Sequence, residues 1–134
     1  MAGVDDETRN RQAMASAANA AYYDAFERKD FATMASLWEP GDRTVCTHPG
    51  WPPIHGTDAI LQSYASIFNG PQTLQVILTN ELVVAESDLA YVSIDENLVD
   101  EQGNTSSTSG LNVFAWNDDR WQIVVHHASP IMSR

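Results

Sequence analysis

The fold is decided by residues 73–127, which read TLQVILTNELVVAESDLAYVSIDENLVDEQGNTSSTSGLNVFAWNDDRWQIVVHH. Runs rich in Val, Ile, Leu, Tyr and Phe alternate with clusters of Ser, Asp, Gly and Asn, a pattern typical of long strands joined by turns. Such short connections favour antiparallel pairing of successive strands. The pattern predicts strands at 73–85, 89–99, 106–116 and 121–127.

The part of the chain before these strands has a helical pattern instead. Apolar residues recur at every third or fourth position between 14 and 28, which predicts a helix there. Asp30 can accept hydrogen bonds from free backbone amides, so it is a suitable N-cap for a second, short helix at 31–38. A third helix is predicted at 57–68, with Thr57 as its N-cap.

The order of the predicted elements defines the fold class. Helices come first and a run of strands follows, with one additional strand at 43–48 between the second and third helices. Such segregation is typical of an α+β fold in which a curved antiparallel sheet wraps over three N-terminal helices. The chain has 134 residues, and compact domains most often have ~100–150. We therefore predict a single domain over 1–134, with residues 1–10 as a frayed lead into the first helix.

The charge balance limits the classes of partner. Acidic residues outnumber basic ones, 18 against 7, which gives a formal net charge of −11. This charge repels a phosphate backbone or an anionic membrane, so neither nucleic acid nor a membrane is an expected partner. The longest apolar runs are far shorter than the ~20 residues that span a bilayer. Cys46 is the single cysteine and no leader pattern is present, so the expected location is the cytoplasm.

Histidine is the side chain whose ordinary pKa lies nearest to neutrality, so acid–base chemistry would use it first. In the early strand, alternation puts His48 on the same face as Cys46. In the last strand it puts His127 on the face of Trp121, and His126 on the opposite face. We therefore expect His127 to point to the core and to meet His48 at one internal pocket, while His126 faces outward.

Other side chains are placed to contact a ligand at that pocket. The Pro-Gly-Trp loop after His48 would fold Trp51 over the mouth of the pocket. Asn112 lies on the strand face that carries Phe114, where its amide can hydrogen-bond a ligand. Tyrosine hydroxyls can orient a carbonyl or a hydroxyl group. The candidate ligand-binding residues are Cys46, Trp51, Tyr23, Tyr64, Asn112 and Trp38.

A metal site is the alternative chemistry at this pocket. A thiolate from Cys46 with the imidazoles of His48 and His127 would suit zinc or copper and leave a fourth position open. These residues lack the close spacing of a metal-binding motif, so the principal interpretation needs no cofactor. Cys46 as a nucleophile activated by His48 is disfavoured, because side chains two apart on one strand lie ~6–7 Å from each other.

Several segments, taken in order, carry a resemblance to a known family. They are Trp38, the run CTHPGW at 46–51, Gly56, the helix end at 64–68 and the run WQIVVHHAS at 121–129. With these segments the chain resembles the SnoaL-like domains, whose superfamily also contains nuclear transport factor two, ketosteroid isomerase, polyketide cyclases, scytalone dehydratase and limonene epoxide hydrolase. The last strand is also similar to that of the calcium/calmodulin-dependent kinase association domain, which spaces a tryptophan, a histidine and a serine as Trp121, His127 and Ser129 are spaced here.

The resemblance implies a cone-shaped domain, a cystatin-like roll, with a ligand cavity between the helices and the concave sheet. It also implies dimerisation through the opposite face of the sheet, so a homodimer is expected. Where ketosteroid isomerase-like enzymes carry a general-base aspartate, this chain offers His48 or Cys46. The isomerase mechanism therefore does not transfer directly to this chain.

The sequence thus predicts a small-molecule-binding pocket protein with a partly apolar ligand. The leading hypothesis is an enzyme of proton-transfer type, an isomerase, cyclase or dehydratase, in which His48 or His127 is the general base. An apolar enclosure would lower the pKa of such a histidine and keep it able to accept a proton. The alternatives are a non-catalytic homo-oligomerisation or ligand-sensing module, and a metal-dependent enzyme that uses Cys46, His48 and His127.

Overall fold

The computed structural model describes residues 5–132, which form three helices and six strands. The helices precede the four long strands, which confirms the predicted α+β class. A two-residue strand before the third helix was not predicted, because it is short and follows two prolines. The elements are α1 (Asp6–Arg28), α2 (Phe31–Leu37), β1 (Val45–Thr47), β2 (Ile54–His55), α3 (Thr57–Asn69), β3 (Gln75–Glu86), β4 (Leu89–Val99), β5 (Thr105–Asn117) and β6 (Arg120–Pro130).

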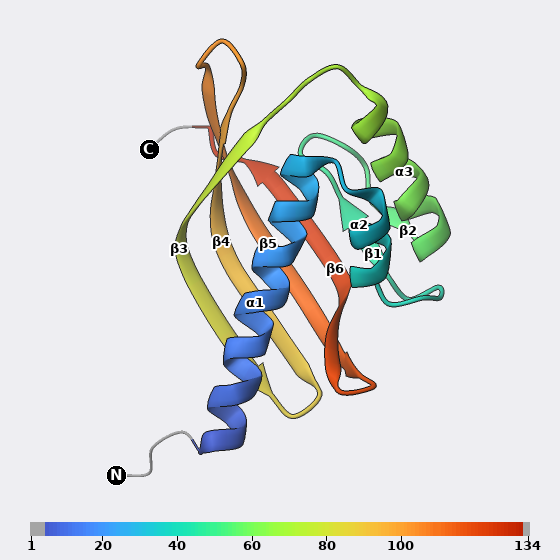
Figure 1. The fold of residues 1–134 in the computed structure, drawn as a ribbon, viewed down its shortest axis with the longest axis vertical. Helices are drawn as coiled ribbons and strands as arrows, with labels where there is room; N and C mark the ends of the chain where they lie inside the picture. Colours follow the sequence, from blue (N-terminus) through green and yellow to red (C-terminus); the bar gives the residue numbers. More distant parts are fainter. Residues whose placement is uncertain (1–4, 133–134) are drawn as a thin grey trace.

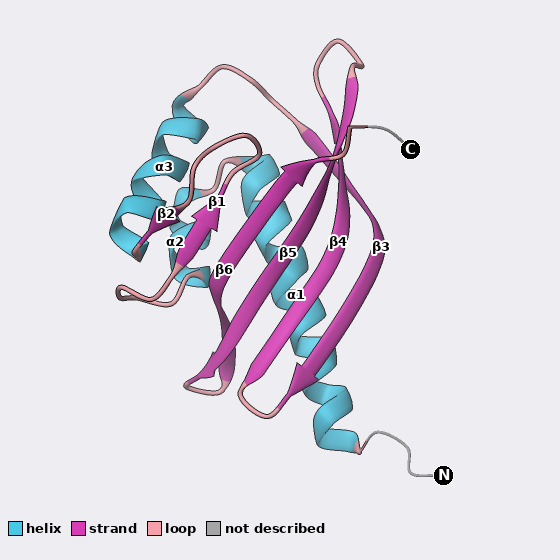
Figure 2. Ribbon diagram, turned by 180° about the vertical axis from the view of Figure 1, so that it is seen from behind, coloured by secondary structure: helices cyan, strands magenta, loops and turns pink. Residues whose placement is uncertain are grey.

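The strands form one mixed sheet in the order β2-β1-β6-β5-β4-β3 (Figure 2). The predicted antiparallel pairing holds for neighbours from β3 to β6. The unpredicted β2 also pairs antiparallel with β1. The exception is β1 with β6, which pair in parallel and place Cys46 opposite His126. These two strands lie far apart in the sequence, so no hairpin constrains their relative direction.

Helix α1 lies along the concave face of the sheet, and α2 and α3 lie beside β1 and β2 (Figure 1). Asp5 is the N-cap of α1, and its side chain accepts from the Thr8 amide at 2.7 Å. The predicted frayed lead is therefore helical from residue 6 to residue 10, and residues 1–4 of that prediction lie outside the described residues. Among residues 5–132, no helix combines the length and the apolar character needed to cross a membrane.

The caps of the two shorter helices differ. Asp30 caps α2 as predicted, since its carboxylate accepts from the Thr33 amide at 3.1 Å and from the Thr33 hydroxyl at 2.7 Å. The N-cap of α3 is Gly56 rather than Thr57, and its φ of 90° is a conformation that favours glycine. Thr57 is the first helical residue, and its hydroxyl donates to the Glu39 carbonyl oxygen at 2.5 Å. This bond ties the start of α3 to the segment after α2.

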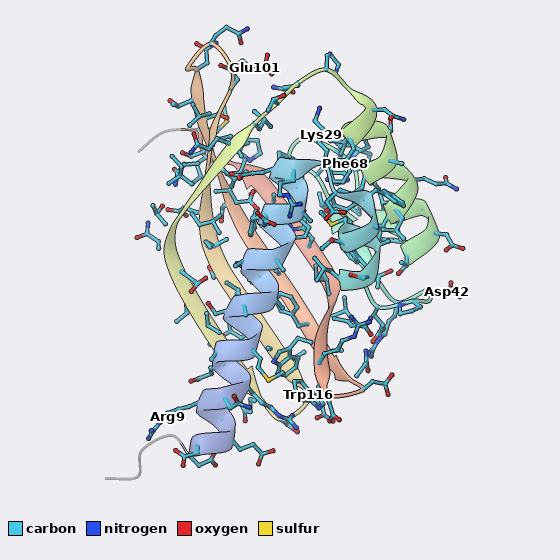
Figure 3. The ribbon with its side chains drawn as sticks, in the orientation of Figure 1. Arg9, Lys29, Asp42, Phe68, Glu101 and Trp116 are labelled. Carbon is cyan, nitrogen blue, oxygen red and sulfur yellow. The ribbon has the colours of Figure 1, made fainter. Side chains whose placement is uncertain are left out.

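The core fills the space between the helices and the concave face of the sheet. Near the N-terminal half of α1, Trp116, which is labelled in Figure 3, packs edge to face against Trp121 with ring centroids 4.9 Å apart. The Arg11 guanidinium lies 4.2 Å from the centre of the Trp116 ring, a contact that contributes ~0.5–1 kcal/mol at exposed sites. Large side chains buried in the core include Tyr22, Met34, Trp38, Ile60, Tyr64, Val92, Ile94, Phe114 and Ile123.

A β-bulge in β6 decides which histidine faces the concave side. Residues 113 and 114 of β5 are adjacent, but their partners on β6 are Val125 and Ile123, so Val124 has no partner. The extra residue inverts the alternation of side chains along the strand. His126 is therefore buried, with 3% of its surface exposed, and His127 is exposed on the convex face. The predictions that His127 points to the core and that His126 faces outward are both wrong.

Candidate functional site

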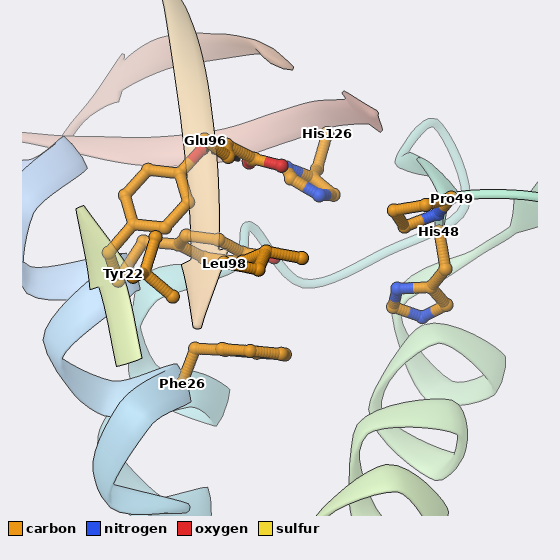
Figure 4. A pocket seen from close by; sticks show the side chains of 9 residues that line it. Tyr22, Phe26, His48, Pro49, Glu96, Leu98 and His126 are labelled. Carbon is orange, nitrogen blue, oxygen red and sulfur yellow. Dashed lines mark hydrogen bonds between the residues drawn. The ribbon is translucent and has the colours of Figure 1, made fainter. Parts of the chain in front are cut away.

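A cavity of about 50 Å³ lies on the concave side between α1, the sheet and the loop after β1 (Figure 4). A buried water needs ~10–15 Å³ of such space, so the cavity suits a small ligand. Most of its walls are apolar or aromatic, and none of its lining residues is a lysine or an arginine. The lining residues are Tyr22, Tyr23, Phe26, His48, Pro49, Val76, Glu96, Leu98 and His126.

His48 follows β1 and is buried, with 5% of its surface exposed. Its Nε2 lies 2.8 Å from the Ser63 hydroxyl oxygen. The Ser63 hydroxyl donates its own proton to the Ile60 carbonyl oxygen at 2.6 Å, so Nε2 of His48 is the donor to Ser63. Burial lowers the pKa of His48 to about 4. At pH 7 the ring is therefore neutral, and its Nδ1 is an unprotonated acceptor.

His126 lies on β6 after the bulge, and its Nδ1 is 2.5 Å from Oδ1 of Asn112. A carbonyl oxygen can only accept, so Nδ1 of His126 carries the proton and Nε2 carries a lone pair. Within residues 5–132 this Nε2 has no hydrogen-bond partner. Burial, and then the positive charge that His48 and His127 would carry, lower the pKa of His126 to about 3. The ring also packs on Tyr22, with centroids 4.9 Å apart.

The imidazoles of His48 and His126 meet across the cavity, with ring centroids 6.5 Å apart. The parallel pairing of β1 with β6 produces this arrangement, because Cys46 is opposite His126 and His48 follows two residues later. In Figure 4 the two rings lie on either side of the same space. His48 thus lines the cavity as alternation predicted, but its partner is His126. Each ring has one nitrogen bonded to a side-chain oxygen and one that is an unprotonated acceptor.

Glu96 of β4 is a buried carboxylate that the sequence interpretation missed. The hydroxyls of Tyr23 and Thr108 both donate to it in short hydrogen bonds. Burial raises the pKa of Glu96, while the bonds from Thr108 and Tyr23 lower it, with a net rise. Gly110 makes room for this side chain, since a Cβ there would lie 2.9 Å from Oε2 of Glu96. Strand alternation from Ile94 places Glu96 on the buried face, and this signal could have found it.

Three of the predicted ligand-binding residues are part of the site. Tyr23 lines the cavity. Asn112 is fully buried behind the cavity, where its Nδ2 donates to Oδ1 of Asn19 at 2.7 Å and to the Tyr23 hydroxyl at 3.1 Å. Trp51 is 45% exposed and packs edge-on against His48 with centroids 4.9 Å apart, so it covers the outer side of that ring.

The other three lie behind the site or away from it. Sγ of Cys46 is 3.6 Å from the Tyr64 hydroxyl, and Tyr64 packs edge-on against His48 at 4.9 Å. Neither residue lines the cavity. Burial raises the pKa of Cys46 to about 12, so its thiol is neutral at pH 7. Trp38 is buried in the core beside Ile123 and does not line the cavity, so its predicted ligand contact is wrong.

The predicted metal ligands do not come together. Cys46 and His48 are adjacent on the concave side, but the bulge in β6 turns His127 to the convex face. Across residues 5–132, no group of three His, Cys, Asp or Glu side chains is placed to hold a metal ion. The alternative site made of Cys46, His48 and His127 is therefore wrong.

Similarity to solved structures covers almost the whole chain. A putative dehydratase of the NTF2-like family from Streptomyces avermitilis is 31% identical and has a TM-score of 0.85, over 94% of this chain and 99% of that one. A putative calcium/calmodulin-dependent protein kinase type II association domain from Thiobacillus denitrificans is 32% identical with a TM-score of 0.74, over 87% of this chain and 94% of that one.

Sequence comparison gives a further relative and the family. The F-box protein SKIP8 of Arabidopsis thaliana is 25% identical over 114 residues. That match spans 85% of this chain but only 48% of the plant protein, so the chain spans about half the length of this relative. The sequence model of the SnoaL-like domain matches residues 15–133. Because this match covers most of the sequence, the protein belongs to the family of SnoaL-like domains.

Proposed function

We propose that the protein binds a small, uncharged, partly apolar molecule in the cavity and transfers a proton on it. His126 is the base, and His48 is the second polar contact. The observation that carries this proposal is the pair of buried, neutral imidazoles, each with an acceptor nitrogen, whose centroids are 6.5 Å apart on a cavity with mostly apolar or aromatic walls. A neutral imidazole at neutral pH can accept a proton without first losing one.

His126 is better supported as the base than His48. Its Nδ1–H is bonded to the Asn112 amide oxygen at 2.5 Å. Such a bond fixes the ring and strengthens when the ring becomes positively charged. His48 is bonded instead to the neutral hydroxyl of Ser63 at 2.8 Å. The pKa of His126, about 3, makes the ring a weak base. The bond to Asn112 partly offsets this weakness, because it stabilises the charged ring.

Charge supports an uncharged substrate. No lysine or arginine lines the cavity, so a carboxylate or phosphate would lose its hydration without gaining a cation. The formal net charge of −11 also disfavours anions. A β-hydroxy ketone fits these limits, since it is neutral, small and has an acidic hydrogen between its two polar groups.

Dehydration is the reaction that the comparisons favour, because the Streptomyces relative is described as a putative dehydratase. In 4-hydroxybutan-2-one, Nε2 of His126 would take a proton from the carbon next to the carbonyl. The electrons of that C–H bond form the C=C bond, and the C–O bond to the hydroxyl breaks. The imidazolium returns its proton to the leaving hydroxyl, so the products are but-3-en-2-one and water and the histidine is regenerated.

The test follows 4-hydroxybutan-2-one in D₂O by NMR, with and without the protein. We expect protein-dependent exchange of the hydrogens next to the carbonyl, together with release of but-3-en-2-one. His126→Gln should lower both rates by ~10²–10⁴, the usual contribution of a general base. His127→Gln, on the exposed convex face, is the matched control. Equal rates in the unaltered protein and in His126→Gln would rule out the proposed base.

A second candidate function is homo-oligomerisation through the convex face of the sheet. Ile77, Leu82, Leu89 and Leu111 are 39–56% exposed there, and the Thiobacillus relative is described as a putative association domain. Sedimentation of the unaltered protein should show a homodimer, which the Leu82→Asp/Leu111→Asp double variant should separate into monomers. Phe31→Asp, an exposed position on α2, is the control. Monomers of the unaltered protein at high concentration would exclude this function.

A further inference from the structure

Glu96 and His126 are the ends of one chain of hydrogen bonds that runs through Tyr23 and Asn112. Each bond in this chain has a direction. The Tyr23 hydroxyl donates to Glu96, so its oxygen is left to accept from Nδ2 of Asn112 at 3.1 Å. With its nitrogen turned to Tyr23, the Asn112 amide presents Oδ1 to Nδ1 of His126.

Because the bonds follow in this order, the acceptor character of Glu96 decides which nitrogen of His126 carries the proton. A carboxylate has no proton to donate, so it fixes the Tyr23 hydroxyl as a donor, and the remaining bonds follow in turn. Gly110 keeps the space that the Glu96 side chain occupies, because a Cβ at that position would lie 2.9 Å from its Oε2. The Tyr23 hydroxyl links Asn112 to Glu96, because it bonds to both side chains.

We propose that Glu96, acting through Tyr23 and Asn112, holds His126 with its Nε2 lone pair available to the cavity, and that the cavity therefore selects a ligand that donates hydrogen bonds, an uncharged alcohol or phenol. Glu96 is a positioning residue in this scheme, because it acts through other side chains. The inference rests on the proposed binding site and does not require that the protein be an enzyme.

The opposite wall of the cavity supports the same class of ligand. Nε2 of His48 donates to Ser63, so its Nδ1 is also an acceptor. Sγ of Cys46 lies 3.9 Å from Nδ1 and 3.7 Å from Nε2 of this ring. The near-equal distances place the sulfur away from the lone-pair direction of either nitrogen, so Nδ1 keeps its acceptor capacity.

The hydroxyl groups of the cavity wall are engaged in hydrogen bonds with other side chains. The Tyr22 hydroxyl shares a hydrogen bond of 2.5 Å with the Tyr64 hydroxyl, and the Tyr23 hydroxyl donates to Glu96. The unprotonated nitrogens of His48 and His126 therefore offer a ligand two acceptors. An acceptor-only ligand would leave both nitrogens buried without a partner, which costs free energy.

The chain of hydrogen bonds could also run in the reverse direction, because Asn19 has a donor that could bond to a reversed Asn112 amide. Nδ2 of Asn19 is buried without a partner among the described residues. If the Asn112 amide turned over, its oxygen would face Asn19 and Tyr23, and a rotated Asn19 amide could then donate to it. Glu96→Gln introduces an amide that can donate to the Tyr23 hydroxyl, which would start the chain in the reverse direction. His126 would then accept at Nδ1 and carry its proton on Nε2.

The first experiment reads the tautomers directly by ¹H–¹⁵N NMR of the histidine rings in ¹⁵N-labelled protein without ligand. We expect the proton on Nδ1 of His126 and on Nε2 of His48. Glu96→Gln should move the His126 proton to Nε2, and Tyr23→Phe, which removes the link, should give a mixture. Neither variant should change His48. A proton on Nε2 of His126 in the unaltered protein, or an unchanged His126 tautomer in both variants, would overturn the proposal.

The second experiment measures ligand choice with phenol, fluorobenzene and benzoate, three rings that differ in one substituent. Phenol should bind with a dissociation constant about tenfold lower than that of fluorobenzene, which corresponds to one good hydrogen bond. Benzoate should bind more weakly than phenol. Glu96→Gln should narrow the preference for phenol, whereas equal binding of phenol and fluorobenzene to the unaltered protein would overturn the proposal.

The tautomers and the phenol preference do not depend on turnover. If both are found but 4-hydroxybutan-2-one is not processed, only the proposed reaction is wrong. If that compound is processed while the tautomers are reversed, only the role of Glu96 is wrong.

Discussion

His126 faces His48 across the cavity with ring centroids 6.5 Å apart, although the two residues lie far apart in the sequence. Two features of the sheet bring them together. The parallel pairing of β1 with β6 places Cys46 opposite His126, so His48 lies near His126 along the strand direction. The unpartnered Val124 turns His126 to the concave side. The chemistry of the site therefore depends on one extra residue in the last strand.

The bulge predicts different effects for two neighbouring histidines. His126→Gln leaves no N–H at the position of Nδ1, so the Asn112 oxygen loses its donor and the free energy of unfolding should fall by ~1–3 kcal/mol, the cost of a buried polar atom without a partner. His127→Gln changes an exposed side chain and should stay within ~0.5 kcal/mol. Urea unfolding with equal m-values in the three proteins measures both. A larger loss of unfolding free energy for His127→Gln than for His126→Gln would mean that His127, and not His126, is the buried histidine.

The buried histidines also predict loss of stability in acid. Unfolded histidine takes up a proton near pH ~6.5, whereas the folded chain holds His48 neutral to about 4 and His126 to about 3. Between those pH values the unfolded state binds more protons, so the free energy of unfolding falls with decreasing pH, by up to ~1.4 kcal/mol per pH unit for each histidine.

The matched variants isolate this effect from that of the carboxylates. The raised pKa of Glu96 acts in the opposite direction, since it favours folding as the pH falls, but it is common to all the proteins compared. Chemical unfolding between pH 6.5 and 4.5 should give a shallower pH dependence for His126→Gln than for the unaltered protein. His127→Gln should keep the slope of the unaltered protein. Identical slopes in all three would show that His126 is not buried neutral.

Substitutions at Gly110 and Glu96 should have non-additive effects on the free energy of unfolding, because the two residues are in contact. A methyl group at 110 would lie 2.9 Å from Oε2 of Glu96, so Gly110→Ala should cost ~1–3 kcal/mol as an overpacking substitution. The cost should be smaller when Glu96→Ala is also present, because the clashing carboxylate is absent. Ser109→Ala, at the exposed neighbouring position, is the control. A double-mutant cycle checks this, and strict additivity would mean that the two sites do not touch.

Trp51 predicts a change in the pKa of His48. The indole packs against the imidazole at 4.9 Å, and burial is the cause of the low pKa of about 4. Trp51→Ala should expose the ring to water and raise the pKa of His48 toward the ordinary histidine value. An NMR titration of the ring measures this shift, with Phe31→Ala as an exposed aromatic control. A pKa that does not move would assign the burial to Tyr64 and Ser63 alone.

Patterns that act over a few residues predicted much of this fold. The sequence predicted the helical period of α1, the N-cap at Asp30 and the four long strands, because each depends on local spacing or local hydrogen bonding. Alternation in β1 predicted that His48 shares a face with Cys46, and both side chains are buried. The Thr57 cap failed because its hydroxyl is used by the Glu39 carbonyl, a contact between segments that spacing does not reveal.

The rest of the site could not be predicted for related reasons. The bulge at Val124 arises from the fit of β6 against β5, and nothing in the run of apolar residues around it indicates an extra position. Glu96 lies on the buried face of β4 by alternation, but its partners Tyr23 and Thr108 come from helix α1 and strand β5. A buried carboxylate is stable only with such partners, and these become visible only in the fold.

The protonation of His48 and His126, read from ring ¹⁵N shifts as the pH is lowered from 7 to 5, tests the proposed site most directly. We expect both rings to stay neutral over this range, with the proton on Nε2 of His48 and on Nδ1 of His126. A charged ring at either position above pH 5.5, or His127 in place of His126 as the protected ring, would contradict this expectation.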